Sequence, residues 1–412
     1  MNRLLNVFRT YHPIVIILII GTALIFTGLA MSTPFLAIYL AEKTNLNATS
    51  IGLLIGLGAL SGTFGGFLGG TFSDLLGRKS LIIGSLLTSS LVYFGYAFAN
   101  QIFLLSTCII AGGFAASIFR TVSNAFITDL TEKEQQIKVF SFLNMAVNIG
   151  WGVGPLIGVY FGLTSTNIPF ILTGIIYVFY TFTIFVLLSI YHVQPKVQEN
   201  RPSRITFTQS LKMLKSDKVL FWFVLGGLVL AISWGQFSIL LSQFLVSEFD
   251  NGTKLFGILL SVNAVSVIVM QLPMTRWLEK KQPQQILTVG VLFILGGLLG
   301  FSISYHIITL IIAIILLSIA ETVIMPLSNV LIDEIAPKGM SGTYFGAQNF
   351  SSLGIFMSPI LGGFLLDVFN GRIMYIVLAA IAIASIGVYH IGFRLHQSKQ
   401  QKVLSERQSA AY

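Results

Sequence analysis

Twelve apolar stretches of about 20 to 28 residues divide this chain of 412 residues, and they constrain its fold more than any other feature. They lie at 13–40, 49–73, 80–98, 102–128, 138–162, 168–190, 219–246, 255–278, 284–303, 307–332, 342–367 and 373–393. An α-helix rises ~1.5 Å per residue, so such stretches can cross about 30 Å of hydrocarbon. Because the chain is 55% hydrophobic and only 9% charged, a water-soluble fold would expose a grossly apolar surface. We therefore expect an all-α integral membrane protein with twelve transmembrane helices.

The positive charges indicate the orientation of these helices. Of the 24 Lys and Arg residues, three (Lys43, Lys254 and Arg372) fall on one side of the membrane, Arg120 lies within a helix, and all the others fall on the opposite side. Positively charged loops stay in the cytoplasm, which predicts a multi-pass protein of the plasma membrane with both termini cytoplasmic. Residues 1–12 show no cleavage site, and the first apolar stretch is too long for a signal peptide. Topology and contact with anionic lipid account for the net charge of +9, so no nucleic-acid partner is expected.

One pattern of residues occurs twice, about half a chain apart. Gly150-Trp-Gly-Val-Gly-Pro-Leu-Ile-Gly158 is repeated as Gly354-Ile-Phe-Met-Ser-Pro-Ile-Leu-Gly-Gly363, and the segment from Ser123 to Asp129 matches that from Ser328 to Glu334. The repetition predicts two pseudo-symmetric six-helix bundles at 1–190 and 219–393, joined by a polar cytoplasmic linker at 191–218. Within the linker, 206–214 has the spacing of a short amphipathic helix on the inner leaflet. The polar cytoplasmic tail, 394–412, is expected to be disordered.

A tight cytoplasmic turn between the second and third helices carries a carboxylate and two cations. It reads Gly70-Thr-Phe-Ser-Asp74-Leu-Leu-Gly77-Arg78-Lys79. This turn resembles the GxLaDrxGRK signature of the major facilitator superfamily, with Phe72 and Leu75 as departures. The resemblance implies the major facilitator fold, in which the Asp faces the N-terminal end of the eleventh helix, here 341–343, and latches the cytoplasmic side. A phosphate-binding loop is excluded, since it needs Gly directly before Lys and a preceding strand.

The doubled pattern resembles the antiporter signature GxxxGPxxGG of the same family. The first copy supplies Gly150, Gly154, Pro155 and Gly158, with Val159 in place of the last Gly; the second supplies Pro359, Gly362 and Gly363, with Ser358 in place of a Gly. Together with Gly28 to Leu36 in the first helix, which is similar to the family's proline motif, this implies the 12-helix drug:proton antiporter branch and export. Two departures concern proton coupling. Cys108 stands where that branch has an Arg in the fourth helix, and the loop after that helix reads Glu134-Gln135 rather than an acid and an Arg.

Two ionisable residues fall inside the predicted bilayer. Arg120 lies nine residues before Asp129, about 13 Å deep, and Glu321 lies thirteen residues before Glu334, about 20 Å deep. Such a side chain costs at least ~2.5 kcal/mol on insertion scales, so each should face a partner or a wet cavity. We expect Glu321 to carry a proton and Arg120 to bind an anion or a carboxylate; a structural ion pair is the alternative for both.

A sparse set of polar, aromatic and Met residues is expected to line the substrate cavity. In the family, helices one, four, seven and ten line the cavity and helices five and eleven flank it. The corresponding candidates are Thr27, Met31, Phe35, Asn144, Asn148, Trp151, Ser233, Gln236, Phe237, Gln243, Gln348 and Ser352. This lining suits bulky organic molecules better than sugars, which need dense hydrogen bonding. Interhelical packing is the alternative for any one of them.

The sequence predicts a proton-coupled exporter of lipophilic drugs or related small organic molecules that works by alternating access. A same-fold importer or facilitator of a specific metabolite and a flippase for lipid-linked metabolites are the alternatives. An enzyme is not expected, because HExxH, GxSxG and paired intramembrane aspartates are absent from the sequence. The five His residues show no metal spacing and the lone Cys108 allows no intrachain disulfide. We expect no cofactor, and as partners a small organic substrate, protons and membrane lipid, in a monomer.

Overall fold

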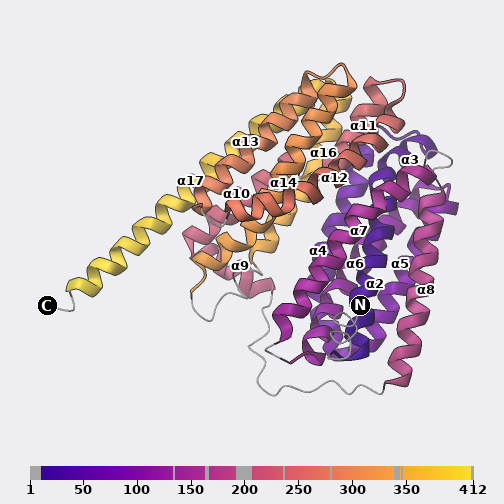
Figure 1. Cartoon of the computed structure of the whole chain (residues 1–412), viewed down its shortest axis with the longest axis horizontal. Coiled ribbons are helices and arrows are strands. Elements are labelled where there is room, and N and C mark those ends of the chain that lie inside the picture. The colour runs from indigo at the N-terminus through magenta and orange to yellow at the C-terminus, as the bar shows by residue number, and fades with distance from the viewer. Residues whose placement is uncertain are drawn as a thin grey trace. The chain divides into compact units, whose positions relative to one another are not determined.

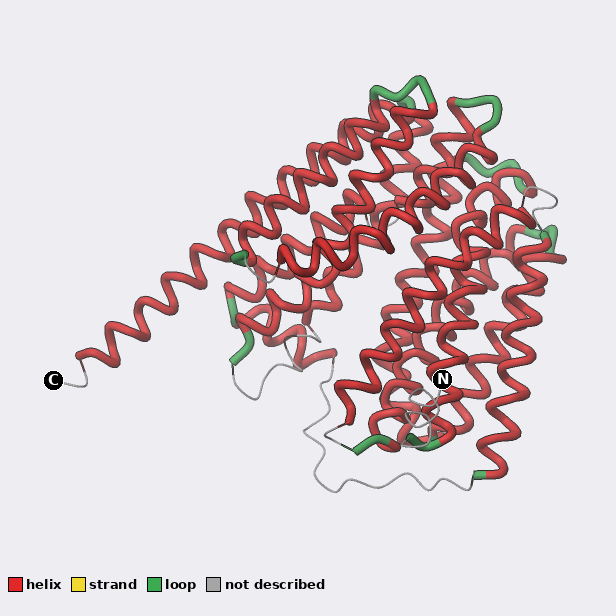
Figure 2. Tube along the Cα trace, in the orientation of Figure 1, coloured by secondary structure: helices red, strands yellow, loops and turns green. Residues whose placement is uncertain are grey.

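The computed structural model describes residues 11–132, 135–162, 167–191, 207–234, 237–278, 281–337, 344 and 347–409. These residues are helical apart from short connections, and none of them forms a strand (Figure 2). Eleven helices in this part are long and apolar enough to cross a membrane. A shorter apolar segment, Phe142–Gly158, lies within the helix Gln136–Gly162. The all-α membrane fold predicted from the apolar stretches is therefore confirmed.

Two compact units divide the chain. Unit 1 comprises 1–202 and 241–264, and unit 2 comprises 203–240 and 265–412. The predicted division into 1–190, 191–218 and 219–393 stays a prediction.

The first six helices lie in unit 1 (Figure 1). They are α2 (Pro13–Ser32) with its continuation α3 (Leu36–Lys43), α4 (Ala48–Leu76), α5 (Arg78–Phe98), α6 (Ile102–Leu130), α7 (Gln136–Gly162) and α8 (Ile168–Ile190). Within the unit α2 packs on α7 and α8, while α5 packs on α6 and α8 and α4 packs on α6.

The remaining elements are named in chain order. They are α9 (Phe207–Ser216), α10 (Lys218–Trp234), α11 (Phe237–Glu248), α12 (Gly252–Leu278), α13 (Pro283–Ser302), α14 (Ile307–Ile335), η3 (Asn349–Ser351), α16 (Ser352–Val368) and α17 (Gly371–Ser409). In unit 2, α10 packs on α16 and α17, and α13 packs on α14 and α17. These pairs repeat those of α2 with α7 and α8, and of α5 with α6 and α8. The helices of unit 2 therefore pair with one another in the same pattern as those of unit 1, as the doubled sequence pattern predicts.

Glycines in the second membrane helix allow α4 and α6 to touch through their backbones. A Cβ on Gly62 would lie 3.1 Å from the carbonyl oxygen of Gly113, and one on Gly65 would lie 2.6 Å from that of Phe114. Such close approach is the usual basis of helix association in lipid, where burial of apolar surface gives no driving force.

The first membrane helix is not continuous. A short 3₁₀ turn, η1 (Thr33–Phe35), separates α2 from α3, and Pro34 lies within it. Proline cannot donate the backbone hydrogen bond to the residue four positions earlier, which explains the break.

Two expectations about the segments predicted to be cytoplasmic have different outcomes. The short helix predicted at 206–214 is present as α9, and its position on a leaflet stays a prediction. The expectation of a disordered tail is wrong, because α17 continues through Ser409. Residues 394–409 contain no Gly or Pro and extend a helix that is already nucleated, so each added residue is ordered at little cost.

Candidate functional site

The predicted cytoplasmic turn consists of one residue between two helices. Gly77 ends α4 and precedes α5, with φ +82° and ψ 148°. A residue with a Cβ is strained at this positive φ, whereas glycine adopts it readily. The glycine therefore lets α5 begin at once with Arg78 and Lys79.

Arg78 forms a buried ion pair across unit 1. Its Nη2 atom lies 2.6 Å from Oδ2 of Asp129 in the last turn of α6, and the two side chains are only 5% and 8% exposed. Removing one partner of such a pair leaves an uncompensated charge away from water, so the pair fixes the start of α5 against the end of α6.

Lys79 connects the same turn to a third helix. Its Nζ atom lies 3.4 Å from the carbonyl oxygen of Leu188 and 3.3 Å from Oγ of Ser189, and 5.6 Å from the ring centre of Phe185. These residues belong to the last turns of α8, where unpaired carbonyl groups attract a cation. The two cations of the motif thus anchor α5 to both α6 and α8.

Two parts of the predicted latch lie outside the described residues. They are the side chain of Asp74 and the segment 341–343, which the family resemblance places opposite each other. The latch stays a prediction.

The first antiporter motif packs directly on the first membrane helix. A Cβ on Gly150 would lie 2.8 Å from the backbone nitrogen of Thr27, and one on Gly154 would lie 2.5 Å from the carbonyl oxygen of Thr27. One on Gly158 would meet the carbonyl oxygen of Met31. Three glycines therefore bring α7 into backbone contact with α2, and Pro155 lies within α7 between the last two.

The second copy of the motif repeats part of this contact in unit 2. A Cβ on Gly354 would meet the carbonyl oxygen of Leu228 and lie 3.1 Å from the backbone nitrogen of Ile232, both in α10. Pro359 lies inside α16, and Gly362 and Gly363 are buried. The three heavy atoms nearest to a Cβ on Gly362 all belong to the side chain of Leu240.

Ser358 takes the position of Gly154 in the second copy. Its side chain is fully buried, and its hydroxyl has no hydrogen-bond partner among the residues that the structure describes. The two halves thus differ at the centre of the repeated motif.

Helix α7 presents two different exposed faces. Asn144, Asn148 and Trp151 are exposed and fall within about 60° of one another around the helix, at 3.6 residues per turn. The exposed apolar residues Met145, Ile149 and Leu156 lie about 110° away. A polar face therefore separates the contact with α2 from an apolar face.

The two intramembrane charges lie in different units. Arg120 is exposed on α6, in unit 1. Glu321 is half-buried on α14 in unit 2 and has an interaction partner.

Several other predicted cavity residues are engaged within their own unit. The hydroxyl of Thr27 donates to the carbonyl of Ala23 at 2.8 Å, and that of Ser233 to the carbonyl of Leu230 at 2.7 Å. Met31 is buried, and Phe35 packs edge-on against Phe256 with ring centres 5.5 Å apart.

The remaining candidates lie in the seventh and eleventh apolar stretches of the sequence. Phe237 stacks on Trp234, Gln348 and Ser352 are half-buried, and Gln348 has an interaction partner. Gln236 lies outside the described residues. Gln243 is 8% exposed, and within the described part of the chain neither Oε1 nor Nε2 has a hydrogen-bond partner.

Comparison with known proteins identifies the family. The model of the Major Facilitator Superfamily matches residues 18–352. The chain belongs to the major facilitator superfamily. It is a multi-pass membrane transporter rather than an enzyme.

This transporter is similar to several relatives over most of its length. YqjV of Bacillus subtilis (strain 168), an uncharacterised transporter of the superfamily, is 31% identical over 398 residues, 96% of each chain. A Na(+), Li(+), K(+)/H(+) antiporter of Planococcus maritimus is 24% identical over 373 residues, 83% of this chain and 87% of its own. The quinolone resistance protein NorA of Staphylococcus aureus (strain MSSA476) is 25% identical over 359 residues, 86% of this chain and 90% of its own.

A solved structure agrees with the fold of this transporter. The crystal structure of the nucleoside transporter NupG matches with a TM-score of 0.77 and 14% sequence identity, over 93% of this chain and 99% of that one. At this identity the likeness concerns the fold alone.

Three residues that matter in the structure were not singled out for a role from the sequence. From the sequence, Asp129 marks only the duplication and the depth of Arg120, and no role is predicted for Asp217 and Tyr344, which form a polar network in unit 2. An Asp directly before the apolar stretch that becomes α10 is a recognisable helix N-cap signal. No local signal indicates that Tyr344 contacts it.

Proposed function

We propose that this transporter exports lipophilic organic molecules in exchange for protons, with its two halves alternating access to either side of the membrane. The observation that carries the proposal is the contact that the antiporter motif makes: its glycines at 150, 154 and 158 place α7 against the backbone of α2. Family members with this motif are mostly exchangers. The similarity to NorA, a quinolone resistance protein, supports an organic substrate.

A wet cavity beside α7 is supported by its exposed amides. Asn144 and Asn148 lie within an apolar helix, and amide groups that face hydrocarbon lose their hydrogen bonds to water. Arg120 is exposed within the apolar helix α6, where contact with lipid would cost several kcal/mol. We propose that these side chains face water that the substrate displaces when it binds.

Gln243 is the proposed polar contact for the substrate. A buried amide without a partner costs about 1–3 kcal/mol, and a bound molecule or an ordered water can supply the missing hydrogen bonds. Gln243→Leu is expected to raise the KM for the transported dye, because Leu cannot form these bonds. An unchanged KM would remove Gln243 from the site.

Glu321 is the proposed proton carrier. Its carboxyl is half-buried in an apolar helix, and we propose that it takes up and releases a proton as its access to solvent changes. Arg120 is proposed to bind an anion or hold a carboxylate.

The test is accumulation of cationic, neutral and anionic dyes by everted vesicles under an imposed proton gradient, since an exporter moves its substrate into such vesicles. Glu321→Gln is expected to abolish gradient-driven transport of the dye that the wild type moves. Glu334→Gln is the matched control, since Glu334 is exposed near the end of the same helix. Retained gradient-driven transport by Glu321→Gln would exclude it as the carrier.

A second candidate is exchange of monovalent cations for protons. It is favoured by the similarity to the Na(+), Li(+), K(+)/H(+) antiporter. The same vesicles distinguish the two, because addition of Na⁺, Li⁺ or K⁺ would collapse the proton gradient if the cation is the substrate. Dye uptake into intact cells, with no efflux, would instead favour an importer.

The role proposed for Asp74 is the cytoplasmic latch. Asp74→Asn is expected to impair transport while the protein still inserts into the membrane at wild-type levels. Undiminished transport would remove the latch from the mechanism.

A further inference from the structure

Asp217 occupies the junction between the linker helix and the seventh membrane helix. It is the single residue between α9 and α10. Its Oδ1 atom accepts hydrogen bonds from the backbone N–H groups of Val219 at 2.8 Å and Leu220 at 3.3 Å, so it caps α10. Its own N–H donates to the carbonyl of Met213 in α9 at 3.0 Å. One residue therefore ends one helix and starts the next.

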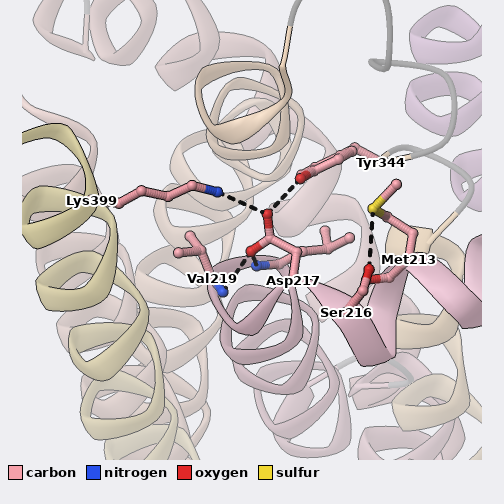
Figure 3. A network of polar contacts seen from close by, with 7 residues as sticks. Met213, Ser216, Asp217, Val219, Tyr344 and Lys399 are labelled. Carbon is pink, nitrogen blue, oxygen red and sulfur yellow. Dashed lines mark hydrogen bonds and ion pairs between the residues drawn. The ribbon is translucent and has the colours of Figure 1, made fainter. Parts of the chain in front are cut away.

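The second carboxylate oxygen of Asp217 joins two segments that are distant in sequence (Figure 3). The hydroxyl of Tyr344 donates to Oδ2 at 2.6 Å, and Nζ of Lys399 lies 3.2 Å from the same atom. Tyr344 lies five residues before η3 in the eleventh membrane segment, and Lys399 lies on α17. The carboxylate thus accepts four hydrogen bonds from α10, the eleventh segment and the C-terminal helix.

The three partners of this network differ in exposure. The Asp217 side chain is 14% exposed and Tyr344 is 2% exposed, whereas the Lys399 side chain is 59% exposed. Burial alone would raise the pKa of Asp217, but the hydrogen bonds from Tyr344, Lys399 and Leu220 lower it overall. Asp217 is therefore ionised at cellular pH, and Lys399 is the more exposed of its two side-chain partners.

A second set of contacts joins the same three elements. Oγ of Ser351 donates to the carbonyl of Val224 in α10 at 3.0 Å. The ring of Phe223 packs against Tyr389 and Phe393 of α17, with ring centres 5.9 and 5.0 Å apart. The Asp217 network therefore lies at one end of the contact that α10 makes with the eleventh segment and α17.

The C-terminal helix is much longer than a membrane crossing requires. Its 39 residues span about 58 Å, whereas hydrocarbon is about 30 Å thick. Lys399 lies six residues beyond Phe393, where the long apolar stretch of α17 ends, so the Asp217 contact anchors the polar part of this helix.

We infer that Asp217 is a positioning residue that joins the linker helix, the start of the eleventh membrane segment and the polar part of α17 into one rigid piece, so that changes at the C-terminal helix reach the eleventh segment. This inference concerns any transport cycle of this protein and does not depend on the direction of transport or on the substrate. It gives the C-terminal helix a regulatory role in setting the turnover of the transporter.

Hydrogen exchange measured by mass spectrometry on the full-length protein in lipid nanodiscs tests the inference. Asp217→Asn keeps a good helix cap but loses the charge, so exchange is expected to rise several-fold both at 395–409 and at 347–352. Lys399→Gln is expected to raise exchange at 395–409, and Lys399→Arg to preserve wild-type rates. Arg394→Gln is the matched control, because it removes one exposed positive charge from the same helix.

Two results would overturn the inference. Wild-type exchange at 395–409 in Asp217→Asn would show that the carboxylate does not hold the C-terminal helix. An equal increase in Arg394→Gln would show a general effect of charge. Should Asp217→Asn not fold, Lys399→Gln decides alone, since Lys399 is largely exposed and its loss leaves the bundle intact.

Transport kinetics give the readout that a purely structural role would not move. Lys399→Gln is expected to change the maximal rate for the transported dye or cation at least two-fold with an unchanged KM, and Lys399→Arg to restore it. An unchanged maximal rate would leave the contact without influence on the cycle and contradict the regulatory role.

Discussion

Arg78 and Asp129 form an ion pair with 2.6 Å between Nη2 and Oδ2, and each side chain is more than nine-tenths buried. Arg78 belongs to the short motif that joins α4 to α5, and Asp129 lies at the end of α6, so the motif acts inside its own bundle as well as in the proposed latch. Breaking a buried pair by removing one partner costs about 3–5 kcal/mol, more than the pair itself contributes.

The first prediction concerns this pair. Arg78→Ala and Asp129→Ala are each expected to lower the thermal stability of the purified transporter by several degrees, and the double variant to lose less than the sum of the two. Thermal unfolding in detergent measures all three. Additive losses would show that the two side chains are not coupled, and Glu334→Ala, at an exposed position, provides the control.

A second prediction concerns the contact of α7 with α2. Gly154→Ala places a Cβ 2.5 Å from the carbonyl oxygen of Thr27, and overpacking of this kind costs about 1–3 kcal/mol. Gly387→Ala is the control, because a Cβ there meets nothing within 4 Å. Thermal unfolding should place the Gly154 variant well below the Gly387 variant, and equal midpoints would contradict the close contact.

A third prediction concerns Ser358. Its buried hydroxyl has no hydrogen-bond partner in the described part of the chain, so Ser358→Ala is expected to leave stability unchanged or raise it by about 1 kcal/mol. Ser385→Ala is the comparison, because the buried hydroxyl of Ser385 donates to the carbonyl of Ala382 at 2.6 Å. A larger loss of stability for Ser358→Ala than for Ser385→Ala would show that the Ser358 hydroxyl is paired.

A fourth prediction concerns the pH dependence of stability. The pKa of Asp217 is lowered in the folded protein, since hydrogen bonds from Tyr344, Lys399 and Leu220 outweigh the effect of burial. The stability it contributes is therefore present above the unfolded pKa of about 3.9 and is lost as the pH falls through the lower folded value. The destabilisation caused by Asp217→Asn should be full at pH 6 and shrink below pH 4. A difference that stays constant over this range would contradict the charged network.

The membrane helices could be predicted from the sequence because their cause is local. A run of apolar residues in lipid must satisfy every backbone group internally, so each run becomes a helix. The break at η1 required knowing that Pro34 would interrupt α2 rather than bend it. The tail appeared disordered from its polarity, but its order depends on the helix that precedes it.

The candidate site was predicted unevenly for a related reason. The motif residues Arg78 and Lys79 were found by pattern, but their partners Asp129 and Ser189 lie 51 and 110 residues away, and no spacing rule joins them. Likewise, Tyr344 reaches Asp217 across 127 residues. Tertiary packing decides which charges pair across a bundle. The glycines of the repeated motif, in contrast, indicate close helix contact by their small size alone.

The break in the first membrane helix and the proline of α7 lie next to each other. Gly158 follows Pro155 by three residues. A Cβ on Gly158 would meet the carbonyl oxygen of Met31 and would lie 3.0 Å from the ring of Phe35. Pro34 lies between Met31 and Phe35 in the sequence. The two helices touch through their backbones, α2 just before its break and α7 just after the proline within it, and they cannot tilt separately without opening a gap between Gly158 and Met31. Bending of α3 and of the C-terminal end of α7 is therefore a joint movement about one common level of the bundle.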